Sequence, residues 1–240
     1  MKKILLGLAA VALMAGPAMA DKVRMGTEGA YPPYNFINDS GEVDGFEREL
    51  GDELCKRAKL DCEWVTNEWD SIIPNLKSGN YDTIIAGMSI TAERDKVIDF
   101  TQDYIPPSPS AYAAMSGGSV DINGGVIAAQ TGTIQASHIA ASGATLAEYK
   151  TPDETIAAVK NGEADAVLAD KEFLAPFVAE SGGDMVFVGE VPLGGGIGMG
   201  VRESDGDLKA KMDAAIASVK ADGSLNTMIK KWFGDEAQTY

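Results

Sequence analysis

The sequence contains few of the residues that most often carry catalysis or hold metal ions. Its 240 residues include one histidine, His138, and two cysteines, Cys55 and Cys62. We therefore predict no Ser-His-Asp or Cys-His catalytic group and no metal site, because no cluster of histidines and carboxylates is present. A pair of carboxylates acting as acid and base stays open as an alternative. The expectation is a protein that is not an enzyme, with no catalytic residue and no cofactor.

Basic side chains are also scarce. The chain has 20 lysines and arginines against 36 acidic residues, a formal charge of −16. Such a surface repels nucleic acid and anionic membranes, and it raises the local concentration of cationic solutes. A role in solubility alone explains the same composition. We expect no nucleic-acid partner.

Long apolar runs are absent after the first 20 residues. Those residues combine Lys2 and Lys3, an apolar stretch over 4–15 and the small-residue pattern Ala18-Met19-Ala20. This order is typical of a secretory signal peptide, and the stretch is shorter than the roughly 20 residues of a membrane-spanning helix. We predict a signal peptide over 1–20, cleavage before Asp21 and a periplasmic protein; a retained anchor is the alternative.

The two cysteines are separated by six residues. In an oxidising compartment Cys55 and Cys62 are expected to form a disulfide between the end of a helix and the start of a strand over 62–65. A loop this short contributes on the order of 2–3 kcal/mol to stability.

One phrase occurs twice in the chain. Residues 77–86, KSGNYDTIIA, match residues 160–169, KNGEADAVLA, class for class. Each copy has a helix-ending glycine, a polar turn and an apolar run typical of a buried parallel strand. The repeat therefore predicts two similar α/β lobes, and the residues after each apolar run are expected to face a shared cleft. The phrase is also simply a good connector between a helix and a strand, which would support architecture more than function.

The predicted lobes are joined by two crossovers. The segment 106–109, PPSP, breaks regular structure, and the glycine run 194–200 indicates a flexible return. We place lobe 1 at 21–107 and 199–240 and lobe 2 at 108–198, with helices over 207–220 and 224–233 packing on lobe 1. Two connections permit hinge closure around a ligand. The glycine run does not match Gly-x-Gly-x-x-Gly, so dinucleotide binding is not predicted.

Three positions suggest ligand chemistry. Arg94 is expected in the first turn of a helix capped by Thr91, where a guanidinium and free N–H groups suit a carboxylate. A surface arginine paired with Glu93 or Asp95 is an equal alternative. Asp170 ends a strand in the other lobe and can pair with a cation, or cap the next segment. The turn 131–133 offers N–H groups to an anion.

Aromatic residues at loops or element edges are further candidates. Core packing explains Tyr31, Tyr34 and Trp69 less readily than buried phenylalanines, and aromatic faces can hold an aliphatic stem or a cation. Glu28 lies where the end of a basic side chain could be bound; a solvated glutamate is the alternative.

Together these segments resemble the family 3 solute-binding proteins of polar amino-acid ABC transporters, over essentially the whole mature chain. Within that family they are most similar to the arginine and lysine/arginine/ornithine/histidine binders. The resemblance is carried by residues 28–34, 45–47, 72–76, 86–94, 130–133 and 221–224.

The resemblance implies a two-lobe type II periplasmic binding fold and a monomer that delivers an L-amino acid to a membrane permease. Arg94 with the N–H groups of Ser89 and Thr133 would hold the α-carboxylate. Asp170 with the Gly87 carbonyl or Ser89 would hold the α-amino group. The side-chain end would meet Tyr31, Trp69, Glu28 and Gln135.

The ligand preference remains divided at this point. Ala86-Gly87 stands where some basic-residue binders have Ser-Ser, which is closer to the arginine and glutamine types. Arginine, lysine or ornithine is the first expectation, with glutamine, histidine or an opine as alternatives and a dehydratase-like enzyme on the same fold as a further one.

Overall fold

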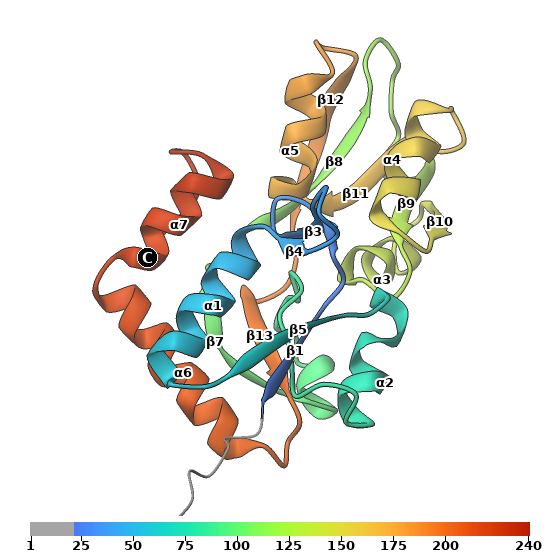
Figure 1. Ribbon diagram of the computed structural model, residues 1–240. Helices are drawn as coiled ribbons and strands as arrows, with labels where there is room; N and C mark the ends of the chain where they lie inside the picture. Colours follow the sequence, from blue (N-terminus) through green and yellow to red (C-terminus); the bar gives the residue numbers. More distant parts are fainter. Residues whose placement is uncertain (1–21) are drawn as a thin grey trace, which may run out of the picture.

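Two five-stranded sheets form the centres of two lobes in the computed structural model, which describes residues 22–240 (Figure 1). The predicted signal peptide lies outside these residues. The first sheet has the order β5-β1-β6-β13-β7, formed by β1 (Val23–Thr27), β5 (Cys62–Thr66), β6 (Thr83–Ile84), β7 (Asp99–Ile105) and β13 (Ile197–Val201). The second has the order β10-β9-β11-β8-β12, formed by β8 (Pro109–Met115), β9 (Val126–Gln130), β10 (Thr145–Tyr149), β11 (Ala166–Asp170) and β12 (Met185–Pro192).

The two sheets share one topology. In the first lobe β1 runs parallel to both β5 and β6, and in the second β9 runs parallel to both β10 and β11. The next strand is antiparallel in each case, β13 beside β6 and β8 beside β11. The predicted α/β fold of two similar lobes is confirmed.

The repeated phrase performs the same task in both lobes. Gly79 and Gly162 adopt left-handed φ values of 79° and 76°, which suit glycine at a helix end. Asp82 then accepts a hydrogen bond from the Arg24 N–H (3.0 Å), and Asp165 accepts one from the Val126 N–H (2.8 Å). Each aspartate thereby fixes the start of the equivalent parallel strand of its lobe, β1 or β9. The phrase is a helix-to-strand connector, used at equivalent places in two equivalent lobes.

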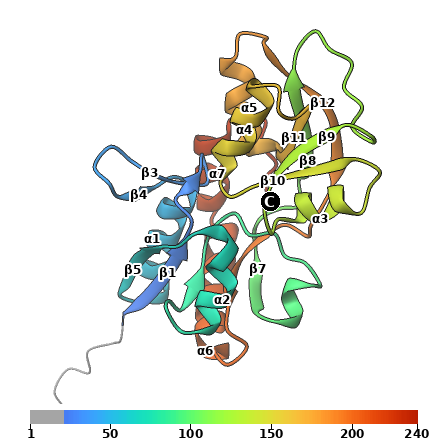
Figure 2. The same cartoon turned by 90° about the vertical axis from the view of Figure 1, so that its right-hand side faces the viewer.

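Helices cover the faces of both sheets (Figures 1 and 2). In the first lobe α1 contacts α6 and α7, and α6 packs on β7, so the two C-terminal helices return to this lobe as predicted. The helices are α1 (Phe46–Ala58), α2 (Ile72–Lys77), α3 (Ile134–Ala140), α4 (Pro152–Lys160), α5 (Lys171–Glu180), α6 (Gly206–Ala221) and α7 (Ser224–Phe233). Short 3₁₀ turns are η1 (Trp69–Ser71) and η2 (Arg94–Lys96), and a small third sheet has β2 (Ala30–Tyr31), β3 (Asn35–Ile37) and β4 (Val43–Asp44).

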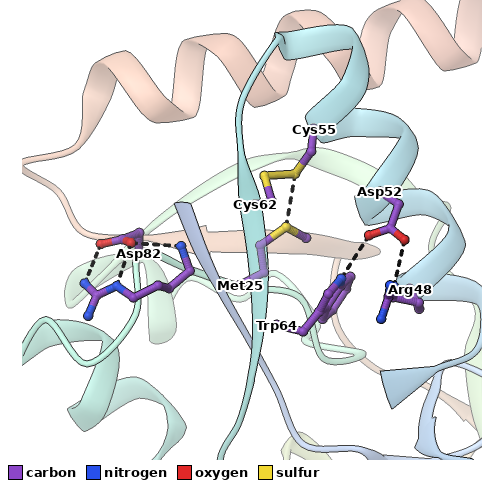
Figure 3. The surroundings of a disulfide bond; sticks show 8 residues. Met25, Arg48, Asp52, Cys55, Cys62, Trp64 and Asp82 are labelled. Carbon is purple, nitrogen blue, oxygen red and sulfur yellow. Dashed lines mark hydrogen bonds and ion pairs between the residues drawn. A yellow bond between two sulfur atoms is a disulfide. The ribbon is translucent and has the colours of Figure 1, made fainter. Parts of the chain in front are cut away.

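The disulfide joins α1 to β5 (Figure 3). Cys55 lies near the end of α1, Cys62 is the first residue of β5, and the Sγ of Cys55 lies 3.2 Å from the Sδ of Met25 on β1. The predicted pairing is confirmed. Because it sits where β5 begins, the bond is at the opposite end of the sheet from the carboxyl ends of the strands.

Two short segments connect the lobes, residues 106–108 between β7 and β8 and residues 193–196 between β12 and β13. The expectation of a flexible glycine return over 194–200 is wrong beyond residue 196, because β13 pairs with β6 and β7 there. Gly198 and Gly200 permit close packing instead: a Cβ atom would lie 2.8 Å from Ile90 Cδ1 and 3.0 Å from Ile98 Cδ1, respectively. The division at 107/108 and 198/199 stays a prediction.

The helix expected from Thr91 is also wrong. Thr91 Oγ1 does accept a hydrogen bond from the Arg94 N–H (3.1 Å), but only the single turn η2 follows. Ile98 is fully buried and the chain enters β7 at Asp99, so the apolar residues after Arg94 belong to the sheet.

Candidate functional site

A cavity lies between the lobes at the carboxyl ends of the central strands. This is where open α/β sheets place their ligands. All ten residues predicted to bind ligand line it, together with two that were not predicted. The lining consists of Glu28, Tyr31, Trp69, Ala86, Gly87, Ser89, Arg94, Gln130, Thr133, Ile134, Gln135 and Asp170.

Arg94 reaches the cavity from the first lobe. Its guanidinium donates to the Ser89 carbonyl (2.9 Å) and lies over the Trp69 ring, 5.3 Å from the centroid. Among the ion pairs of residues 22–240 there is none between Arg94 and Glu93 or Asp95, so the surface-arginine alternative fails. Burial lowers the pKa of Arg94 to about 10, partly offset by the charge of Asp170. A half-buried cation without an acidic partner in contact suits an anionic ligand group.

Asp170 faces the same cavity from the second lobe. Its Oδ2 accepts from the Tyr31 hydroxyl (2.9 Å) and its Oδ1 from Gln135 Nε2 (3.0 Å). Asp170 occupies the N-cap position of α5, yet its side chain makes no capping hydrogen bond, so the carboxylate is directed to the site. Burial raises the pKa of this carboxyl to about 6, although the Tyr31 hydrogen bond and Arg94 act in the opposite direction.

Glu28 is the second carboxylate of the cavity. Its Oε1 accepts from Gln130 Nε2 at 2.6 Å, a contact between the lobes. Burial raises the pKa of Glu28 to about 7, against the Gln130 hydrogen bond and with a small contribution from Asp153 and Asp70. The half-buried Glu28 is therefore not the solvated glutamate of the alternative interpretation. A positively charged ligand group would stabilise its ionised form.

The three aromatic candidates have different surroundings. Tyr31 and Trp69 line the cavity, but the Tyr31 ring stacks on Phe173 of the other lobe, with centroids 4.2 Å apart and an interplanar angle of 8°. Tyr34 is 1% exposed and packs against Phe233, with centroids 4.7 Å apart. The expectation that core packing explains Tyr34 poorly is wrong, because Tyr34, directly before β3, is buried against Phe233 of α7 in the first lobe.

Backbone groups complete the wall. Ala86, Gly87 and Ser89 follow β6, and Gly87 has a left-handed φ of 59° with its N–H bound to Glu47 Oε1 (2.7 Å). Thr133 caps α3, because its Oγ1 accepts from the Ala136 N–H (3.1 Å). Gly87 and Asp170 directly follow the two copies of the repeated phrase, so equivalent strand ends supply one backbone group and one charge.

The lobes touch each other around this cavity. Besides the Tyr31–Asp170 and Glu28–Gln130 hydrogen bonds, Lys150 of the second lobe pairs with Glu68 of the first at 2.6 Å. Arg94 also donates to the Gly132 carbonyl at 3.5 Å. The two lobes are therefore in direct contact around the cavity.

Sequence reasoning missed Gln130 and Ile134. Gln130 is the last residue of β9, so the rule that singled out Asp170 at the end of β11 applies to it equally. Ile134 is the first residue of α3, and an apolar residue there gives no signal of its own.

Within residues 22–240 no group of three or more histidine, cysteine or acidic side chains is placed to hold a metal ion. In the same part of the chain, none of the helices has both the length and the apolar character needed to span a bilayer.

Comparisons with known proteins agree with this geometry. Residues 23–235 match the bacterial extracellular solute-binding proteins, family 3. The L-arginine-binding protein of Pseudomonas aeruginosa is 34% identical and the histidine-binding periplasmic protein of Salmonella typhimurium 32% identical, each alignment covering 97% of both chains. A solved structure of a periplasmic His/Glu/Gln/Arg/opine family-binding protein from Silicibacter pomeroyi, in complex with lysine, is 74% identical with a TM-score of 0.89. That match covers 91% of this chain and 100% of the other.

Proposed function

Because the chain belongs to the bacterial extracellular solute-binding proteins, family 3, we propose that it captures a basic L-amino acid between its lobes for an ABC transporter. One observation carries the proposal: Arg94 of the first lobe and Asp170 of the second line one cavity, with Glu28 as a further carboxylate. A zwitterion with a cationic side chain carries one anionic group that can pair with Arg94 and two cationic groups that can pair with Asp170 and Glu28.

The zwitterionic end of the ligand would bridge the lobes. Arg94 with the N–H groups of Ser89 and Thr133 would hold the α-carboxylate, a pairing that a guanidinium makes through two parallel hydrogen bonds. Asp170, with the Gly87 carbonyl or Ser89, would hold the α-ammonium group. A ligand bound by both lobes favours the closed form, since its contacts with both exist only there.

The side-chain end would lie between Trp69 and Tyr31 and reach Glu28, with Gln135 assisting near Asp170. Glu28 is half-buried, and Gln130 supplies it with a hydrogen bond and no charge. A lysine, ornithine or arginine side chain would supply that charge. The names of the relatives, which include arginine, histidine and lysine ligands, support this choice. Glutamine and opines are the competing ligands.

The same proposal includes a periplasmic location after removal of residues 1–20, a monomeric state and delivery of unchanged ligand to a membrane permease. The relatives reported above are binding proteins, which supports capture without turnover.

Isothermal titration with L-lysine, L-arginine, L-ornithine, L-histidine and L-glutamine tests the proposal. We expect the basic amino acids to bind most tightly, and Arg94→Lys to weaken them by at least about tenfold, because an ammonium group keeps the charge but cannot make the two parallel hydrogen bonds of a guanidinium. Arg48→Lys is the matched control, since Arg48 pairs with Asp52 on the surface of α1. Binding confined to glutamine, or chemical conversion of a bound amino acid, would overturn the assignment.

A further inference from the structure

The motif Gly45-Phe46-Glu47 is not explained by the cavity lining. Glu47 lies in the first turn of α1 and is fully buried. Its Oε1 accepts from the Gly87 N–H (2.7 Å) and from the Tyr104 hydroxyl, and its Oε2 accepts from Asn35 Nδ2 (2.7 Å). None of the ion pairs within residues 22–240 includes it. Burying a carboxylate costs free energy unless it is hydrogen-bonded. The three hydrogen bonds of Glu47 offset that cost, and their arrangement requires an explanation.

Those donors belong to three different parts of the first lobe. Gly87 is in the cavity wall and Tyr104 is on β7, next to the last residue before the crossover. Asn35 is on β3, and its Oδ1 accepts from the Gly29 N–H at 2.7 Å. Gly29 directly follows Glu28. The carboxylate of Glu47 is thereby connected through one side chain to the loop that carries Glu28.

The hydrogen bonds constrain both side chains. Two N–H groups and the Tyr104 hydroxyl surround Glu47, and an ionised carboxylate, which offers acceptors only, matches all three contacts. Asn35 must donate to Glu47 and accept from Gly29, so its amide cannot turn over without losing both bonds. Burial raises the pKa of Glu47, while the bonds from Tyr104, Gly87 and Asn35 act against that rise.

We propose that Glu47, acting through Asn35, is a positioning residue that sets the distance between the Gly87 backbone and Glu28, and thereby the preference for long basic side chains. The inference rests on the proposed function, in which Gly87 lies at the α-amino end of the ligand and Glu28 at the end of its side chain. Glu47 itself does not line the cavity.

A change in the distance between Gly87 and Glu28 is expected to affect the affinities for different ligands to different extents. An arginine or lysine would contact both ends of the connected pair, so its affinity depends on their separation. A glutamine would make the same contacts at the α-amino end but weaker contacts with Glu28. Displacement of the Glu28 loop is therefore expected to lower the affinity for glutamine less. A loss of fold stability alone would weaken all ligands alike.

The decisive experiment is a double-mutant cycle with titration of L-arginine and L-glutamine. Glu47→Gln places an amide donor against the Asn35 donor, and we expect arginine affinity to fall at least about tenfold, with a smaller change for glutamine, as for loss of a hydrogen bond to a charged group. The double variant Glu47→Gln with Asn35→Asp restores an acceptor opposite each donor, including Gly29. We expect it to recover arginine affinity to within about threefold of the wild type.

Glu49→Gln is the control, because Glu49 lies on the same helix and pairs with Lys231 at the surface, 2.6 Å away. If Glu47→Gln does not fold, Asn35→Ser is the second variant: it removes the amide that bonds both Glu47 and Gly29, and is expected to lower the arginine-to-glutamine affinity ratio about fivefold. An unchanged ratio in the single variants, or no recovery in the double variant, would overturn the inference alone. A wild-type protein that binds neither arginine nor lysine would overturn the proposed function, and the inference with it.

Discussion

The hydroxyl of Tyr31 donates a 2.9 Å hydrogen bond to the carboxylate of Asp170, and the two residues come from different lobes. The Tyr31 ring also stacks on Phe173, which lies in α5, three residues after Asp170. Tyr31 therefore joins the lobes through both its ring and its hydroxyl, at the residue proposed to hold the ligand ammonium group.

Replacing Tyr31 by phenylalanine separates these two contributions. Tyr31→Phe keeps the stacked ring and removes the hydrogen bond to Asp170, which is worth about 1.5–3 kcal/mol when the acceptor is charged. We expect the affinity for L-arginine to fall by at least about tenfold. Titration calorimetry measures the change, with Tyr149→Phe on β10 as the control. An unchanged affinity would show that the hydroxyl does not contribute to closure.

The affinity for arginine is expected to depend on pH in a way that glutamine affinity does not. Glu28 has a pKa of about 7 and must be ionised to pair with a guanidinium. The ligand cation lowers that pKa, so binding is strongest above pH 7 and weakens as the pH falls through it, by about tenfold between pH 8 and pH 6. Asp170, with a pKa of about 6, affects both ligands alike at the lower end of this range.

Titrations of L-arginine and L-glutamine at pH 8, 7 and 6 measure this difference. The affinity for glutamine is expected to change by less than about threefold over this range, because only the titration of Asp170 affects it. In Glu28→Gln the two ligands are expected to show the same profile. Equal pH dependence in the wild type would remove Glu28 from the recognition of the side chain.

The disulfide is expected to affect stability without affecting binding. Replacing both Cys55 and Cys62 by serine opens a loop with a sequence separation of 7, and the free energy of unfolding is expected to fall by about 2–3 kcal/mol. Urea denaturation gives that value. The dissociation constant for ligand is expected to stay within about twofold, because the bond lies at the far end of the first sheet from the cavity. A large loss of affinity would connect the two regions.

Acid stability is expected to depend on Asp82. Burial acts to raise the pKa of this carboxyl from 3.8, but hydrogen bonds from Arg24 and Arg202 lower it to about 2. A folded-state pKa below the unfolded value gives stability that is complete above about pH 4 and is lost as the pH falls through 2. Asp82→Asn is therefore expected to cost about 2 kcal/mol at pH 7 and almost nothing near pH 2.

Denaturant unfolding at pH 7, 4 and 2 measures the effect. Asp39→Asn, in the exposed turn between β3 and β4, serves as the control. A cost at pH 2 equal to that at pH 7 would mean that the charge of Asp82 is not what holds β1.

The sequence predicts the parts of the site that follow from strand ends and turn chemistry. The repeated phrase located both Gly87 and Asp170, which directly follow its two copies. Glu28, Tyr31 and Trp69 were singled out by their positions at loops or element edges, and the family resemblance then assigned their roles. Their proximity depends on long-range packing that local patterns do not contain.

Other features could not be predicted for physical reasons. β13 contains two glycines that permit close packing against Ile90 and Ile98. From the local sequence alone, such glycines indicate a flexible segment rather than a strand. The burial of Tyr34 depends on Phe233, about two hundred residues away in the chain. The bonds of Glu47 join α1 to β3, to β7 and to the segment that follows β6, so no single window of sequence indicates them.

The first and last described elements of the chain bear on the design of a fluorescent sensor. Val23 opens β1 and Tyr240 bonds to Asn226 of α7, so both belong to the first lobe. Fluorophores attached at these two places would move together during closure and report little. A donor dye near Tyr240 combined with an acceptor in the turn at Gly182 and Gly183, in the second lobe, would follow the hinge motion directly.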